Sequence, residues 1–309
     1  MILKKSWGDR WATVVALGLL VGSLGLAGCT SSHSTPGMIN VVGAEVQYGD
    51  VLAQIGGAYV HVTSIMNNPN TDPHNFEASP SVAQAIAAAK IIVQNGAGYD
   101  SFMNQLESAS ANSSRDVISV VALRDQVSAA NPHFWYSPTT MPMVARVVTS
   151  DLVTIAPQHA AYFRSHEATF VRSWRRVTAA LVTARHDVAG NKVATTEPVG
   201  DYLLAAMGLD NLTPFRFQAD VMNGIDPSPQ DIVTQQNLLT SHAVAALCYN
   251  AQVSSPVTLA LRNLAIKDHV PTVAIYETMP QGLHVQTWML SEISAIEAAI
   301  AAVVTGRSQ

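Results

Sequence analysis

Two histidines and two glutamates stand at matching places in this sequence, each just beyond a segment with the pattern of a β-strand. His74 and His133 each directly follow a proline, in TDPHNFEAS and NPHFWYSP. Glu197 follows the run KVATT, and Glu277 follows PTVAIY. Imidazole nitrogens and carboxylate oxygens together suit a divalent transition-metal ion such as Zn²⁺ or Mn²⁺. The four side chains can form one site only if the fold brings them together.

The sequence alternates between strand-like and helix-like patterns on both sides of one long helical segment. Before that segment the strand-like runs are INVVGAEV, AYVHVTSIM, IIVQNGAG and RDVISVVAL, and after it they are KVATT, AVAALCYN and PTVAIYE. This alternation predicts parallel-type sheets covered by helices. Ligands of such sheets bind outside the carboxyl ends of the strands. We therefore expect the four residues, two in each half, to converge in a cleft between the halves.

The long helical segment, residues 157–187, contains no glycine and no internal proline, and its apolar residues recur at helical spacing. The predicted fold is therefore α/β, with two lobes joined by one long rigid linker helix. We place an N-terminal lobe at residues 38–156 and a C-terminal lobe at residues 188–309. The lobes share a repeated pattern but no repeated sequence.

The N-terminus has the pattern of a secretory signal. Lys4, Lys5 and Arg10 precede an apolar run that ends at Leu26 and is shorter than the roughly 20 residues of a membrane-spanning helix. The following Leu-Ala-Gly-Cys resembles the bacterial lipobox, which implies a signal peptide at residues 1–28, a lipid on Cys29 and a flexible tether at 29–37. The alternative is an uncleaved anchor helix. In both cases the rest of the chain lies outside the cytoplasmic membrane, and with lipidation it is anchored there.

Cysteine content and charge exclude several kinds of protein. Cys29 and Cys248 are the only cysteines, so a lipidated Cys29 leaves no disulfide and stability must come from a core. Cys248, in AVAALCYN, is expected to be a small apolar residue on a buried strand. The net charge of −5, without a basic stripe, argues against nucleic acid as a partner. We expect a monomer.

Several motifs carry a family resemblance. TDPHNFEASPS resembles the Asp-Pro-His-x-Tyr/Phe-Glu-x-x-Pro-Ser motif of bacterial metal-binding lipoproteins that feed ABC transporters for manganese and zinc, the cluster A-I solute-binding family. NPHFW is similar to that family's Asn-Pro-His-x-Trp motif. The resemblance runs from Ile39 to the last helix and includes the segments NGAGY, EPVGDYLL and ETMPQG.

The resemblance implies a single divalent metal ion, Zn²⁺ or Mn²⁺, held between two lobes and delivered to an ABC transporter permease and its ATPase. It implies that His74 and His133 are ligands, and Glu197 fits the third ligand position. The family's fourth ligand is usually an aspartate near the last strand, where Glu277 is the nearest acid. The sequence does not decide between the two metals.

One residue near the predicted site departs from the family motif, and the role of two others is not decided by the sequence. Ser137 stands where many family members have aspartate, and we expect it to cap the helix that follows. Asn250 and Gln252 follow the strand AALCY, where they either line the cleft or cap a turn.

Two other functions fit part of the pattern. A secreted zinc hydrolase would use three protein ligands and keep one position open for water, but the sequence has no HExxH motif. An adhesin or structural surface lipoprotein would carry the histidines and glutamates as an incidental site. The paired ligands favour metal capture, and no enzymatic activity is expected.

Overall fold

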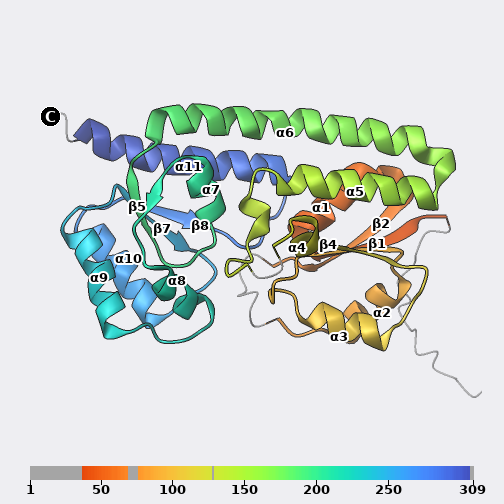
Figure 1. Cartoon of the computed structure of the whole chain (residues 1–309), viewed down its shortest axis with the longest axis horizontal. Coiled ribbons are helices and arrows are strands. Elements are labelled where there is room, and N and C mark those ends of the chain that lie inside the picture. The colour runs from red at the N-terminus through yellow and green to blue at the C-terminus, as the bar shows by residue number, and fades with distance from the viewer. Residues whose placement is uncertain (1–36, 69–75, 127–128, 307–309) are drawn as a thin grey trace, which may run out of the picture. The chain divides into compact units, whose positions relative to one another are not determined.

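The computed structural model describes residues 37–68, 76–126 and 129–306. Within them the chain forms two four-stranded parallel sheets, each with helices against it (Figure 1). In the parts so described, no helix is both long and apolar enough to cross a membrane. Two predicted positions, the ligand His74 and the lipidation site Cys29, lie outside the described residues, as does the predicted signal peptide.

The N-terminal sheet has the strand order β2-β1-β3-β4, and every neighbouring pair is parallel. The central strand β1 pairs Val41 with Val62 on one side and with Ile91 on the other. The strands are β1 (Ile39–Glu45), β2 (Val60–Met66), β3 (Ile91–Gln94) and β4 (Asp116–Ser119). The helices are α1 (Val46–Gly56), α2 (Pro80–Ala88), α3 (Phe102–Ala109), α4 (Val120–Leu123) and α5 (Thr140–Ile155).

The C-terminal sheet repeats this arrangement with the order β6-β5-β7-β8, again parallel throughout. The predicted α/β fold with a repeated pattern is therefore confirmed. The strands are β5 (Lys192–Thr195), β6 (Asp210–Asn211), β7 (Ala246–Asn250) and β8 (Thr272–Ile275). The helices are α7 (Asp201–Ala206), α8 (Phe215–Met222), α9 (Pro229–Thr240), α10 (Pro256–Lys267) and α11 (Val285–Gly306).

Successive residues of the central strands face different cores, as strands covered on both faces require. On β1, Val41 belongs to the large core beneath α1, α5 and α6, whereas Val42 belongs to a separate core with residues of α2 and α3. On β5, Val193 belongs to the large core and Ala194 to one formed with α8, α9 and α10.

The predicted linker helix is present as α6, Ala160–Val188, preceded by a 3₁₀ turn at Pro157–His159. The helix thus begins three residues after the predicted start. Its apolar side chains, which recur at helical spacing, are buried in a core that contains residues of both sheets and of α11. Figure 1 shows α11 lying along α6. These two helices and the shared core connect the lobes.

The predicted strand RDVISVVAL is shorter than expected, because β4 ends at Ser119 and Val120–Leu123 is helical. Its β-branched residues favour a strand locally. However, the Val121 amide donates to the carbonyl of Asn95, and the Gln126 amide donates to the carbonyl of Val121, which turns the chain away from the sheet. Tertiary contacts therefore override the local preference here.

Gly43 allows β1 and α1 to approach closely, and its replacement by alanine is expected to destabilise the fold by about 1–3 kcal/mol. A Cβ at Gly43 would lie 2.4 Å from the backbone nitrogen of Gly49, and this backbone cannot move aside alone. Urea unfolding measures the loss. Gly200→Ala is the matched control, because its Cβ would lie 3.6 Å from the nearest atom, on the Ile275 side chain. Equal stability of the two variants would contradict this prediction.

Candidate metal site

His133 is fully buried and directly precedes the 3₁₀ turn Phe134–Tyr136 in the segment after α4. Its neighbour Asn131 fixes the tautomer of the imidazole. Asn131 donates its Nδ2 hydrogen to the carbonyl of Pro198 (2.7 Å), and its Oδ1 accepts from the His133 amide (3.0 Å). The same Oδ1 lies 2.8 Å from His133 Nδ1. Because Oδ1 can only accept, Nδ1 carries the proton and Nε2 presents a lone pair. This is the arrangement in which a metal-binding histidine is usually held.

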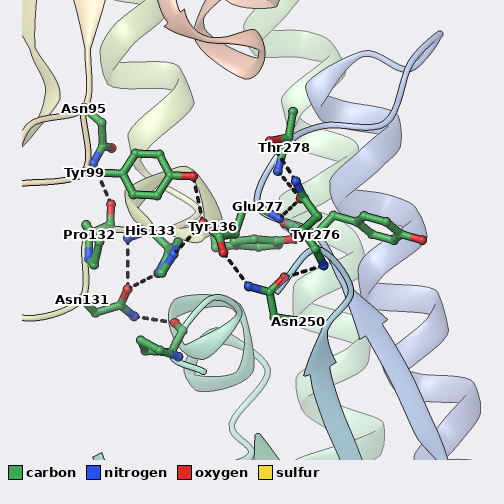
Figure 2. Close-up of polar contacts among 12 residues, drawn as sticks. Asn95, Tyr99, Asn131, Pro132, His133, Tyr136, Asn250, Tyr276, Glu277 and Thr278 are labelled. Atoms are coloured by element: carbon green, nitrogen blue, oxygen red, sulfur yellow. Dashed lines mark hydrogen bonds and ion pairs between the residues drawn. The ribbon is translucent and has the colours of Figure 1, made fainter. Parts of the chain in front are cut away.

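Glu277 lies two residues beyond β8, fully buried and opposite His133 (Figure 2). Its Oε2 is 3.4 Å from His133 Nε2 and accepts a hydrogen bond from the Tyr99 hydroxyl (2.9 Å). Its Oε1 accepts from Asn250 Nδ2 (2.5 Å). The structure therefore brings one predicted ligand from each lobe into a single buried site.

The facing atoms of His133 and Glu277 have the spacing of two ligands on one ion. With metal–ligand distances near 2.0–2.1 Å, neighbouring corners of a tetrahedral zinc site are about 3.3 Å apart. Among the described residues, His133 Nε2 has no hydrogen-bond partner. A lone pair that faces a carboxylate oxygen in a buried place is stable only with a cation or a proton between them. His133 and Glu277 therefore fit as two of the ligands of a divalent metal ion.

Glu197 is buried directly after the C-terminal end of β5, where the loop that carries it contacts the loop that carries His133. The carbonyl of the next residue, Pro198, accepts the hydrogen bond from Asn131, and the Tyr202 hydroxyl donates to the Asn131 carbonyl (3.0 Å). Over residues 37–68, 76–126 and 129–306, no group of three or more His, Cys, Asp or Glu side chains could hold a metal ion. The structure places His133 Nε2 and Glu277 Oε2 in contact, and Glu197 in a loop next to that of His133.

Asn250 and Gln252 belong to this site, which answers the question that the sequence left open. Gln252 Oε1 accepts from the amides of Glu277 and Thr278, both at 2.7 Å. The backbone amide of Gln252 in turn donates to Asn250 Oδ1 (2.9 Å). Both residues hold Glu277 in place. The available signal was their position at the end of β7, since Asn250 is its last residue, Gln252 follows two residues later, and β7 and β8 are neighbours in the sheet.

A polar network behind His133 supports its loop. Asn95, directly after β3, donates to the Pro132 carbonyl (2.8 Å) and accepts from the Tyr48 hydroxyl (2.7 Å). Asp100 accepts from the Asn95 amide (2.6 Å). Burial, followed by the charge of Asp100, raises the pKa of Glu45 well above its usual value. Burial and this neighbouring charge therefore favour the protonated form of Glu45.

Three other polar or ionisable residues have structural roles. Ser137 does not cap a helix: its Oγ accepts from Arg124 (3.0 Å), and α5 begins at Thr140 without a side-chain cap. Cys248 is buried on β7 as predicted, and burial raises the pKa of its thiol to about 12, so it stays protonated. His284, close after Glu277 in sequence, lies 2.7 Å from Asp50 on α1, with its side chain mostly exposed.

Comparison with known proteins shows the family of the chain. The family model for "zinc-uptake complex component A, periplasmic" matches residues 41–299, a range that covers both sheets and α6. The chain belongs to this zinc-uptake component A family. The resemblance recognised in the sequence motifs is thereby confirmed.

Sequence relatives of this zinc-uptake component A family member match it over most of their own length. A manganese ABC transporter substrate-binding lipoprotein, PsaA of Streptococcus pneumoniae, is 22% identical over 259 residues, which are 78% of this chain and 82% of PsaA. A putative metal-binding protein of Chlamydia trachomatis is 23% identical over 227 residues, 72% of this chain and 80% of that protein.

A solved structure has the same fold. The periplasmic zinc-binding protein TroA of Treponema pallidum superposes with a TM-score of 0.73 at 17% identity and covers 85% of this chain and 99% of TroA. The two-lobed architecture with one long connecting helix is therefore shared with a protein of known structure.

Proposed function

We propose that this protein captures one divalent transition-metal ion, zinc or manganese, between its two lobes and delivers it to an ABC importer. The observation that carries the proposal is the buried contact between His133 Nε2 and Glu277 Oε2, with the imidazole tautomer fixed by Asn131. The relatives support it, because their names record zinc, manganese or metal binding.

The proposed ligands are His74, His133, Glu197 and Glu277. Two neutral imidazoles and two carboxylates make the loaded site formally neutral, which lowers the cost of burying a doubly charged ion. His133 and Glu277 are already in contact. Glu197 joins them through the loop contact between Asn131 and Pro198. His74 is included on the sequence motif alone.

Several further properties belong to the same proposal. The four ligands leave no position for a catalytic water, so the protein is not an enzyme. It acts outside the cytoplasmic membrane as a monomer anchored by a lipid on Cys29, behind a signal peptide at 1–28 and a tether at 29–37. Its partners are the permease and ATPase of an importer. The lobes comprise residues 38–156 and 188–309, and 157–187 connects them.

Elemental analysis and calorimetry test this function. Protein purified without chelator is expected to contain about one zinc or manganese ion per chain, and chelator-treated protein is expected to rebind one ion tightly. Absence of binding would favour a structural or adhesive role. Turnover of an ester or peptide substrate by the zinc-loaded protein would favour a hydrolase. Either result would overturn the proposal.

A further inference from the structure

The two oxygens of Glu277 have different partners, which bears on how this residue can hold an ion. Oε2 accepts from the Tyr99 hydroxyl (2.9 Å) and faces His133 Nε2 (3.4 Å), whereas Oε1 accepts from Asn250 Nδ2 (2.5 Å), as Figure 2 shows. A carboxylate oxygen has two acceptor sites, so Oε2 can accept from Tyr99 and bind an ion at the same time. Oε1 lies on the side of Asn250.

Asn250 cannot turn its amide around to release Oε1. Its Oδ1 accepts from the backbone amide of Gln252 (2.9 Å), so Nδ2 is the atom that faces Glu277. The Asn250 backbone is also fixed, since its amide donates to Thr196 Oγ1 (3.0 Å) on the neighbouring strand end. Asn250 is buried, and a hydrogen bond to a charged group in such a place is costly to break.

We propose that Asn250 and Tyr99 are positioning residues that restrict Glu277 to one-oxygen coordination and thereby favour zinc over manganese. Tyr99 directs Oε2 toward His133, and Asn250 withholds Oε1 from the ion. Zinc in a protein site takes four ligands in a tetrahedral arrangement, whereas manganese is found with more oxygen ligands in octahedral sites. Loss of a second carboxylate oxygen therefore costs manganese more than zinc. This inference rests on the proposed function.

The test compares zinc and manganese affinities in the wild-type protein and in Asn250→Ala. Because zinc binds more tightly than manganese to most sites, the informative quantity is the change in the ratio of the two dissociation constants. With Oε1 released, we expect the preference for zinc to fall by about tenfold or more, which corresponds to one hydrogen bond to a charged group. Asn223→Ala, at the exposed end of α8, is the matched control and should leave the ratio unchanged.

Co²⁺ provides a second measurement that does not depend on affinity. Co²⁺ in the wild-type protein should show the intense visible absorption of a four-coordinate ion, and Asn250→Ala should weaken these bands as a fifth ligand oxygen binds. A wild-type spectrum of higher coordination would overturn the inference even if Asn250→Ala fails to fold. An unchanged affinity ratio and an unchanged spectrum in Asn250→Ala would also overturn the inference. The proposed function, capture of a metal ion, would not be affected by that result. If the wild-type protein binds neither zinc nor manganese, the proposed function fails and this inference fails with it.

Discussion

Replacement of His133 by alanine is expected to weaken zinc binding by at least about a hundredfold. In other metal sites, removal of a residue that only hydrogen-bonds to a ligand already weakens metal binding by about 10–100-fold, and His133 is placed to bind the ion directly. Its Nε2 faces Glu277 Oε2 in a site where neither side chain is exposed, so water cannot easily replace the imidazole. Calorimetric titration of chelator-treated protein with Zn²⁺ measures the effect.

His186→Ala is a suitable control for this variant, because it removes one histidine at an exposed position on α6 where the neighbour is Asp187. Its affinity for zinc should equal that of the wild-type protein. Wild-type affinity in His133→Ala, with the fold intact by circular dichroism, would exclude His133 from the ligand set.

Stability is expected to decrease as the pH rises from about 5 to 8, and Glu292 on α11 is one of the buried carboxyl groups that cause this decrease. Its carboxylate is buried and accepts from Trp288 Nε1 (2.9 Å) and from the Tyr136 hydroxyl (3.4 Å). Burial nevertheless dominates and raises the pKa of Glu292 to about 7. In the unfolded chain the same group has a pKa near 4.5.

Between these two pKa values the folded protein holds a proton that the unfolded chain has released, so raising the pH favours unfolding. Stability is therefore highest below pH 4.5 as far as this group is concerned, and the loss is complete above pH 7. The difference amounts to about 3 kcal/mol at most. The half-buried Asp151, with its pKa raised to about 6, adds a smaller effect of the same sign.

Glu292→Gln separates the two contributions, because glutamine imitates the protonated acid at every pH. Urea unfolding at pH 5 and pH 8 should show a smaller loss of stability in Glu292→Gln than in the wild-type protein, while the contributions of Asp151 and the other buried acids stay in both. Parallel pH profiles for the two proteins would show that Glu292 is ionised in the folded state at neutral pH.

The alternation of strands and helices along the chain could be predicted from the sequence because the central strands are short, mostly apolar runs between helical segments. The long helix was equally clear from thirty residues without glycine. In contrast, β6 is only Asp210–Asn211, too short for a periodic pattern, and α5 (Thr140–Ile155) contains a proline and several β-branched residues that weaken a helical signal.

The contact between His133 and Glu277 could be expected from the sequence, whereas the contacts of the residues that support it could not. His133 and Glu277 could be selected because each follows a strand or precedes a helix at the expected edge of its sheet. The role of Asn250 depends on the pairing of β7 with β8, and that of Tyr99 on a contact with a residue in the other lobe. Such contacts arise only when the whole chain has folded, so the sequence could place Asn250 near the site but could not show what it contacts.

The hydrophobic core that runs from β1 through α6 to α11 leaves little freedom for the lobes to separate. A binding protein with independent lobes can empty its cleft by a hinge motion that moves the lobes apart. Here the same motion would expose apolar side chains of α6 to water. The lobes are therefore expected to melt in one cooperative transition. An importer that empties this site must act on the loops around His133 and Glu277. Release of the ion then requires a change in these loops alone, while the two lobes keep their relative position.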